Sequence, residues 1–223
     1  MKAMILAAGY GKRLMPLTKS LPKPLLKIGN QSLIERNINS LLAAGFNDII
    51  INVSYLAGMI KEHVLEKFPN VNISFSEEKT PLGTGGGVLN AIELLGDGPF
   101  LLINADIYHQ IELKDIKQEV DIAHLVGVYN PDHNVDGDFS LDSGLVSINN
   151  NVNEFTWSGI SVINPKIFDG LNIEDAPFDI WKSILIEYVQ KNKVTGEFTD
   201  STWIDTGTID RLELANKTYK DEN

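Results

Sequence analysis

The segment KAMILAAGYGKRL, residues 2–14, decides the fold, because an apolar strand runs directly into a glycine-rich turn. Residues 3–8 are apolar without alternation, which is typical of a strand buried on both faces of a parallel sheet. Gly9 and Gly11 follow, and Lys12 and Arg13 come next. Backbone N–H groups in such a turn can close on phosphate oxygens, and the cations add charge. The segment therefore predicts an α/β sheet that binds phosphate at the carboxyl end of its first strand.

Charge is distributed unevenly along the chain. Its 223 residues include 19 Lys and Arg against 30 Asp and Glu, a formal net charge of −11. Residues 1–34 nevertheless hold six of the basic side chains and no acid, and the first carboxylate is Glu35. A net negative protein lacks the broad positive field that nucleic acid or an anionic membrane requires. A local basic segment instead fits a small phosphorylated ligand.

Other features of the composition narrow the class of protein. The absence of cysteine excludes disulfides, thiolate metal sites and a cysteine nucleophile. No apolar run reaches the roughly 18 residues of a membrane span. The short apolar stretch after Lys2 is interpreted as a buried strand rather than a signal peptide. We expect a cytoplasmic protein that binds neither membrane nor nucleic acid, and no protein partner is evident.

Outward from the turn, short apolar runs alternate with helical patterns, as in βαβ units of a mostly parallel sheet. The pattern predicts strands at residues 2–7, 48–53, 72–76, 100–104 and 122–129, and helices at residues 32–44, 56–68 and 87–95. After about residue 130 the chain is turn-rich and predicts antiparallel hairpins. A further strand is expected at 158–164, and helices near 178–190 and 207–220. We expect this second part to add mixed strands and a lid to one edge of the sheet.

A second basic element follows the turn, since Lys23 stands between Pro22 and Pro24. The prolines restrain the backbone on both sides of the lysine, so its ammonium group is a preorganised charge for a phosphate. A Walker A loop is excluded because Arg13 follows Lys12, and the dinucleotide fingerprint because Leu14 stands where a third glycine is needed. Taken singly, the glycine turn and the proline-flanked lysine are each compatible with a purely structural turn.

Taken together, LAAGYGKRL and PKPLL resemble the signature of the sugar-1-phosphate nucleotidyltransferases. PLGTGGGVLNA (residues 81–91), FLLINADIY (residues 100–108) and WIDTGT (residues 203–208) resemble later motifs of that family, in the same order. These enzymes make a nucleotide-sugar and pyrophosphate from a nucleoside triphosphate and a sugar 1-phosphate. The resemblance implies a single domain, residues 1–223, with a Rossmann-like three-layer sandwich, a mostly parallel sheet and a small antiparallel addition. Residues 1–130 would form the nucleotide-binding core, and residues 131–223 the sugar-binding and lid elements.

The resemblance also assigns roles to individual positions. The catalytic residues would be Arg13, Lys23, Asp106 and Asp205, and the two aspartates would hold Mg²⁺. The nucleotide would be bound by Ala8, Gly9, Gly11, Lys12, Arg13, Lys23, Gly83 and Thr84. The sugar would be bound by Asn104, Asp138, Glu154, Ser158 and Gly159. A Glu-Lys-Pro loop found in many relatives is missing, so Glu154 either replaces it or is a solvated hairpin residue.

The two aspartates also carry an interpretation independent of the family. Asp106 follows an apolar run that ends at Asn104, which puts it at the carboxyl end of a strand. Mg²⁺ prefers one or two carboxylates together with substrate phosphates. Asp205 has a rival role, because Asp205 or Thr206 would also suit the cap of the helix that follows.

The substrates are narrowed by length and by two stretches of the second half. NPDHNVDGDFSL and FTWSGISVINP resemble short family members that use UTP and N-acetyl-α-muramate 1-phosphate in cell-wall sugar recycling. One alternative is a hexose- or heptose-1-phosphate guanylyltransferase, and another is a catalytically silent nucleotide-sugar binding protein. A choline-phosphate cytidylyltransferase is less favoured, since it needs an aromatic cage.

Overall fold

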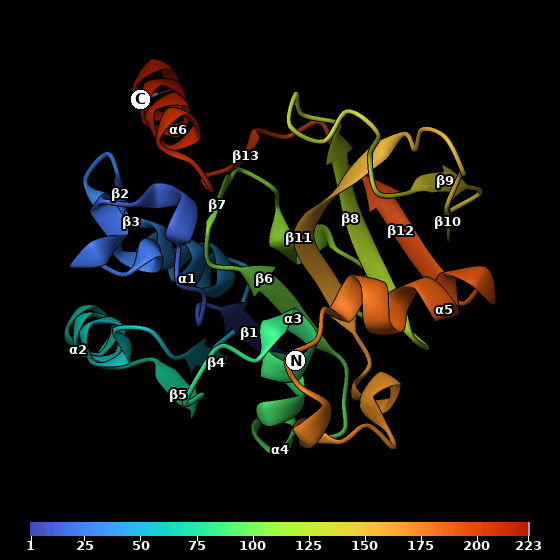
Figure 1. The fold of residues 1–223 in the computed structure, drawn as a ribbon, viewed down its shortest axis with the longest axis horizontal. Coiled ribbons are helices and arrows are strands. Elements are labelled where there is room, and N and C mark those ends of the chain that lie inside the picture. The colour runs from blue at the N-terminus through green and yellow to red at the C-terminus, as the bar shows by residue number, and fades with distance from the viewer. Residues whose placement is uncertain (223) are drawn as a thin grey trace.

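The computed structural model describes residues 1–222, and a nine-stranded sheet forms its centre (Figure 1). The strand order is β5-β4-β1-β6-β11-β8-β12-β10-β9. In chain order these strands are β1 Lys2–Leu6, β4 Asp48–Val53, β5 Asn72–Glu77, β6 Phe100–Asn104, β8 Ala123–Tyr129, β9 Ser140–Asp142, β10 Leu145–Ser147, β11 Phe155–Ile163 and β12 Val194–Phe198. Two small antiparallel sheets pair β2 Lys27–Ile28 with β3 Gln31–Ser32, and β7 Ile107–His109 with β13 Trp203–Asp205.

Helices connect and cover these strands. They are α1 Leu33–Ala43, α2 Ala57–Lys67, α3 Gly83–Asn90, α4 Ile92–Leu95, α5 Ile186–Gln190 and α6 Ile209–Glu222. A π-helical turn, Trp181–Leu185, runs directly into α5. Short 3₁₀ turns lie at Lys12–Leu14, Leu17–Lys19, Lys23–Leu25, Leu113–Asp115, Pro165–Phe168 and Ile173–Asp175. Within residues 1–222, no helix combines the length and apolar character needed to cross a membrane.

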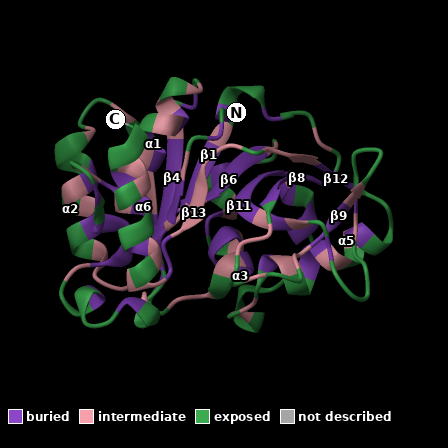
Figure 2. Ribbon diagram, turned by 90° about the horizontal axis from the view of Figure 1, so that it is seen from above, coloured by how far each residue is buried: buried purple, intermediate pink, exposed green. Residues whose placement is uncertain are grey.

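Side chains of each central strand alternate between two apolar layers, because successive residues of a strand point to opposite faces. In β1, Ala3 and Ile5 pack toward α1 and α2, whereas Met4 packs toward α3 and α4. The π turn and α5 extend the second layer beneath β8 and β12. Figure 2 shows buried strands between helices whose outer surfaces are exposed. This three-layer arrangement is the Rossmann-like sandwich that the sequence predicted.

The four strands β5, β4, β1 and β6 are mutually parallel, so their carboxyl ends meet at one edge. The chain first builds outward from β1 to β4 and β5, and then returns to the other side of β1 with β6. The crevice between β1 and β6 is therefore the topological switch point, where ligands of open α/β sheets bind. The glycine turn follows β1, and Asp106 follows β6.

The helix α1 illustrates how local sequence sets an element. The Ser32 side chain accepts the N–H of Glu35, whose carboxylate accepts the N–H of Ser32, forming a capping box. Ile34, Ile38 and Leu41 follow at helical spacing and are fully buried against the sheet. The cap begins the helix where the pattern predicted, and burial of this stripe holds it in place.

Two elements differ from the expectations. The strand β11 lies inside the sheet, between β6 and β8, and runs antiparallel to both, instead of joining one edge. A helix was expected from residue 87, but α3 begins at Gly83 and includes most of the second glycine motif. Gly83 and Gly85 must be glycine, because Phe178 packs directly on both and leaves no space for a side chain.

Candidate active site

A cavity of about 230 Å³ opens at the switch point, where the carboxyl ends of the parallel strands meet. Its walls come from the glycine turn, the proline-flanked lysine, the start of α3 and the segment after β6. The residues that line it are Leu6, Ala7, Ala8, Gly9, Lys23, Pro24, Asn52, Glu78, Pro81, Gly83, Thr84, Asn104, Ala105 and Asp106. We call it the first cavity.

A second cavity adjoins the first on the side of β11 and β13. It is lined by Arg13, Asn104, Asp106, Ile107, His133, Asn134, Asp138, Thr156, Trp157, Ser158, Trp203 and Asp205. The two cavities share Asn104 and Asp106, so this short segment after β6 is the wall between them. Ligands in the two cavities would therefore come close to each other at these two residues.

Lys23 forms an ion pair with Asp106 at this junction. The lysine is only 8% exposed, whereas Arg13 and Lys12 are exposed on the turn. Its place is set by the 3₁₀ turn Lys23–Leu25, which the two prolines restrain. The buried ammonium group thus holds its charge at one position between the cavities.

The pairing of β7 with β13 brings the second aspartate to the same place. Asp205 stands opposite Ile107, the residue after Asp106. The carbonyl oxygen of Asp106 accepts the backbone N–H of Thr206 at 3.0 Å and the Thr206 hydroxyl at 2.8 Å. Both aspartates consequently line the second cavity.

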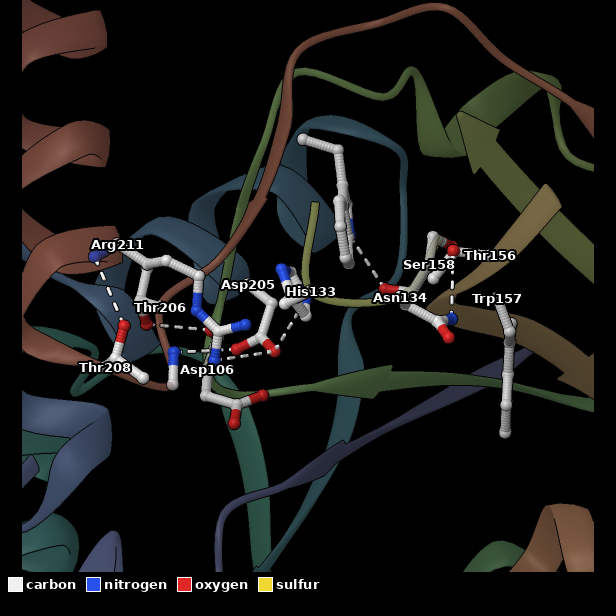
Figure 3. A network of polar contacts seen from close by, with 12 residues as sticks. Asp106, His133, Asn134, Thr156, Trp157, Ser158, Asp205, Thr206, Thr208 and Arg211 are labelled. Atoms are coloured by element: carbon white, nitrogen blue, oxygen red, sulfur yellow. Dashed lines mark hydrogen bonds and ion pairs between the residues drawn. The ribbon is translucent and has the colours of Figure 1, made fainter. Parts of the chain in front are cut away.

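Three donors surround the Asp205 carboxylate (Figure 3). Its Oδ1 accepts the Gly207 N–H at 2.7 Å, and its Oδ2 lies 3.4 Å from Arg211 Nη2 and 3.6 Å from His133 Nε2. The contact with Gly207 stabilises the turn before α6. The cap of α6 is the Thr208 hydroxyl, which accepts the Arg211 N–H at 3.4 Å, and not Asp205 or Thr206.

The two carboxylates suit a metal ion that is shared with a substrate. Within residues 1–222, no group of three or more His, Cys, Asp or Glu side chains is arranged to hold a metal. Mg²⁺ needs fewer protein ligands, because it keeps waters and takes oxygen atoms from phosphates. Asp106 and Asp205 offer hard oxygen donors at one cavity, so the residues present fit such an ion.

The motifs that build these cavities match a known family. The profile of the nucleotidyl transferase family matches residues 2–127, more than half of the chain. The chain belongs to the nucleotidyl transferase family. The match includes the glycine turn, Lys23, the second glycine motif and Asp106, and it confirms the resemblance seen in the sequence.

Individual nucleotidyl transferases are similar along the whole chain. An N-acetylmuramate alpha-1-phosphate uridylyltransferase of Neisseria meningitidis is 39% identical over 96% of both chains. A mannose-1-phosphate guanyltransferase of Schizosaccharomyces pombe is 31% identical over 93% of this chain, which spans 61% of that longer protein. The solved structure of HddC from Yersinia pseudotuberculosis with GMP-PN is 26% identical, with a TM-score of 0.80, and the match covers 98% of this chain and 99% of that one.

The predicted nucleotide-binding positions of this nucleotidyl transferase are only partly gathered at the first cavity. Ala8, Gly9, Lys23, Gly83 and Thr84 line it. Thr84 is also tied to the π turn region, because its hydroxyl donates to Asp179 at 3.0 Å. The other predicted positions, Gly11, Lys12 and Arg13, lie outside this wall, and Arg13 lines the second cavity instead.

Two glycines are needed for steric reasons. Gly11 has φ +64°, and a Cβ there would lie 2.9 Å from Thr18 Cγ2. Gly83 has φ +76°, and a Cβ would lie 2.4 Å from the Phe178 carbonyl oxygen. Both positions thus combine a left-handed backbone with close neighbours, which only glycine tolerates.

The predicted sugar-binding residues divide in the same way. Asn104, Asp138 and Ser158 line the second cavity. Gly159, with φ +78°, lies behind Asn104, whose Nδ2 would be 2.4 Å from a Cβ at that position. Glu154 lines neither cavity, because it is exposed on the β9–β10 side and its carboxylate accepts the Leu141 N–H at 3.4 Å. This position matches the solvated hairpin alternative and not a replacement for the missing loop.

Several residues of the site were missed in the sequence. Asn52 and Glu78 line the first cavity, and Arg211 contacts Asp205. His133, which the sequence did not single out, lines the second cavity. Asn52 is the fifth of the six residues of β4 and Glu78 directly follows β5, so both lie near the carboxyl end of a strand, as Asp106 does. Nothing local in the sequence of α6 distinguishes Arg211 from the other charged residues of that helix.

The surroundings shift the pKa of two of these groups. Burial raises the pKa of the Glu78 carboxyl, although hydrogen bonds from Leu82 and Asn52 oppose the shift. Burial also lowers the pKa of His133, and the positive charges of Arg211 and Arg13 lower it further against the opposing effect of Asp205. The neutral ring of His133 is therefore favoured at the wall of the second cavity.

Proposed function

We propose that this chain transfers the uridylyl group of UTP to N-acetyl-α-muramate 1-phosphate, with Mg²⁺, and releases pyrophosphate. The observation that supports it is the junction of two cavities at Asn104 and Asp106, with the buried Lys23 on the same carboxylate. The nucleoside occupies the first cavity and the sugar occupies the second. Their phosphates then meet at the junction, where the positive charge of Lys23 is held.

The nucleotide is bound mainly by main-chain groups in this proposal. Ala8 and Gly83 face the base and ribose from opposite walls, with Thr84 beside them. The glycine turn wraps the triphosphate, and its N–H groups and the side chains of Lys12 and Arg13 neutralise charge. These cations are exposed before the nucleotide arrives, so they are free to close on it.

The reaction needs alignment and charge neutralisation, and no general base. An ionised oxygen of the sugar phosphate attacks the α-phosphorus in line, and the bond from that phosphorus to the pyrophosphate oxygen breaks. Lys23 stabilises the charge that develops at the α-phosphate, and Arg13 stabilises the departing pyrophosphate. Asp106 and Asp205 hold the metal ion, which when bound neutralises phosphate charge and orients the oxygens.

The sugar is held by Asn104, Asp138 and Ser158 on the second cavity. Asp138 is oriented for this task, because its Oδ2 accepts the Trp157 N–H at 2.8 Å and leaves Oδ1 for a hydroxyl. Glu154 has no part in the assignment, since it lies outside both cavities. In this division residues 1–130 supply the nucleotide-binding core, and residues 131–223 supply the sugar-binding and lid elements.

The choice of UTP and of the muramate sugar comes from the relative of matching length. The Neisseria uridylyltransferase aligns over 96% of both chains, so the second half, which carries Asp138 and Ser158, is included. We propose cytoplasmic cell-wall sugar recycling as the setting, on the resemblance to the short family members.

Guanylyl transfer to a hexose or heptose 1-phosphate is the second candidate. It is favoured by the mannose-1-phosphate guanyltransferases at 31% identity and by the HddC structure with GMP-PN. The two candidates share the junction and its residues, and differ in the base and the sugar alone.

A screen for pyrophosphate release separates the candidates. Purified protein with Mg²⁺ is incubated with UTP, GTP, CTP or dTTP against a panel of sugar 1-phosphates that includes N-acetylmuramate 1-phosphate and mannose 1-phosphate. The highest kcat/KM is expected for UTP with N-acetylmuramate 1-phosphate. A preference for GTP with a hexose or heptose phosphate would support the second candidate, and no release with any pair would contradict both.

A further inference from the structure

Two buried polar side chains, Asn52 and Glu78, touch inside the first cavity. Asn52 is the fifth residue of β4 and is 2% exposed, and Glu78 follows β5 and is 6% exposed. The Asn52 amide Nδ2 donates to Glu78 Oε1 at 2.6 Å. Burying polar groups this deeply costs free energy unless their hydrogen bonds are satisfied. The hydrogen bonds of this pair therefore offset that cost.

The outer atoms of the pair hold the backbone on both sides of the cavity. Asn52 Oδ1 accepts the N–H of Ala7 at 2.7 Å, directly before the glycine turn. Glu78 Oε2 accepts the N–H of Leu82 at 2.9 Å, directly before Gly83 and α3. One continuous chain of hydrogen bonds therefore runs from the first glycine segment through two side chains to the second.

The direction of each hydrogen bond is dictated by the backbone. Both ends of the chain are N–H donors, so both outer atoms must be acceptors. The side-chain oxygen of Asn52 is the acceptor at one end, and its amide nitrogen points toward Glu78. An ionised carboxylate then accepts on both of its oxygens. The two residue types thus satisfy every polar atom of the chain.

The helix α3 lies directly against the pair. A Cβ at Gly87 of α3 would lie 2.6 Å from Asn52 Nδ2 and 2.8 Å from Glu78 Oε1. The backbone of α3 therefore packs closely against the pair. A similar amide–carboxylate contact, Asn72 Nδ2 to Asp48 Oδ1 at 3.2 Å, joins the same two strands at their other end, but it is exposed and remote from the cavity.

We propose that Asn52 and Glu78 are positioning residues that fix the distance between Ala7–Ala8 and the start of α3, and thereby set the affinity for the nucleoside triphosphate. The inference rests on the proposed function in one respect, that the first cavity takes the nucleotide. Neither side chain takes part in the transfer itself.

Substitutions that exchange the amide and the carboxylate, with little change in side-chain size, test this role. Asn52→Asp removes the central donor and sets two carboxylates against each other, whereas Glu78→Gln turns an amide donor toward either Asn52 or Leu82. The double variant Asn52→Asp/Glu78→Gln restores all three hydrogen bonds, because the introduced amide then donates to the introduced carboxylate and both outer oxygens remain acceptors. The matched control is Asp48→Asn/Asn72→Asp with its two single variants.

Binding of UTP, and of GTP in parallel, is measured by titration calorimetry without a sugar acceptor, and circular dichroism follows the fold. Each single variant at 52 and 78 is expected to raise Kd about ten- to hundredfold, as the loss of a buried hydrogen bond implies. The double variant is expected to return within about threefold of the wild type, and the control set to leave Kd unchanged. In turnover assays the single variants raise KM for the triphosphate more than they lower kcat.

Several results would overturn the proposal: unchanged Kd in both single variants, a double variant as weak as the weaker single one, or a double variant that does not fold. Single variants that unfold, beside a folded double variant that binds, would support it. The outcome is separable from that of the proposed function. A wild type that binds UTP or GTP without turnover contradicts the transfer reaction and leaves this test intact, whereas a wild type that binds neither contradicts the proposed function.

Discussion

Lys23 and Asp106 form a pair in which each partner depends on the other. The lysine is buried and its ammonium group would carry an uncompensated charge without the carboxylate. In the proposed reaction, substrate phosphates that enter the junction would pair with the ammonium group, and the carboxylate would be released to bind a cation. The ion pair would therefore supply both the positive charge for the phosphates and the carboxylate for the cation that phosphoryl transfer requires.

Lys23→Ala is expected to lower kcat by about a hundredfold or more with little change of fold, because the lost charge acts on the transition state. Pyrophosphate release with saturating substrates measures kcat, and circular dichroism checks the fold. Lys27→Ala is the control, since Lys27 belongs to the same acid-free segment but is exposed. Turnover near the wild-type rate in Lys23→Ala would remove the lysine from the mechanism.

Chelation tests the assignment of Asp106 and Asp205. Treatment with EDTA is expected to abolish pyrophosphate release, and excess Mg²⁺ to restore it, because the carboxylates alone cannot neutralise a triphosphate. Asp106→Asn is expected to need a higher Mg²⁺ concentration for half-maximal rate, as one charged ligand is lost. Full activity in thoroughly chelated protein would refute the metal assignment.

Among the elements, α3 departs furthest from its intrinsic preference. Its first five residues, GTGGG, include four glycines, and each interior glycine costs a helix about 0.5–1 kcal/mol relative to alanine. Tertiary contact explains the glycines, since Phe178 covers Gly83 and Gly85 while Asn52 and Glu78 lie against Gly87. The element is thus held by its neighbours and not by propensity.

Gly87→Ala is expected to lower the free energy of unfolding by about 1–3 kcal/mol, because the added Cβ overpacks the contact with Asn52 and Glu78. Gly58→Ala in α2 is the matched control, since nothing lies within 4 Å of its Cβ. There the better helix former should stabilise the protein by up to about 1 kcal/mol. Urea unfolding measures both, and stabilisation of equal size in the two variants would contradict the packing explanation.

At the scale of the molecule, the junction is assembled by contacts between distant parts of the chain. The strand β13 joins β7 and delivers Asp205 to Asp106, and β11 enters between β6 and β8 and delivers Ser158 to Asn104. The helix α6 then covers the basic segment, where Leu212 and Ala215 pack on Leu14. The second half of the chain completes the site that the first half begins.

His109 links global stability to pH. Burial lowers the pKa of His109 from 6.5 to about 4, and its Nδ1 accepts the Ile111 N–H, which only an unprotonated ring nitrogen can do. The neutral ring is therefore favoured in the folded state, whereas the unfolded chain takes up a proton below pH 6.5. Its contribution to stability is complete above 6.5 and is lost as the pH falls toward 4.

Urea unfolding between about pH 7 and pH 5 measures this contribution, since histidine titrates in that range. The wild type is expected to lose stability progressively on acidification. His109→Asn should show a shallower dependence, because an Asn side chain accepts the N–H two residues on without titrating. Parallel pH profiles for the two proteins would assign the acid sensitivity to other groups.

Local sequence was sufficient for the elements whose signal is short-ranged. The apolar runs of β1, β4 and β6 predict buried parallel strands, and the apolar stripe of α1 predicts a helix. Pattern and chain direction placed Gly9 and Asp106 at the carboxyl ends of strands, and the family motifs were needed to give them and Lys23 a role. The family motifs extended this to Asp205.

The remaining features depend on tertiary contacts, which a local sequence pattern does not encode. The insertion of β11 and the hydrogen-bonded chain through Asn52 and Glu78 join residues far apart in sequence. Their free energy comes from exclusion of water and from hydrogen bonds that exist only after the sheet has closed. For the same reason α3 is helical in spite of its glycines. The tertiary structure also leaves Glu154 exposed to solvent and places Asp138 at the second cavity.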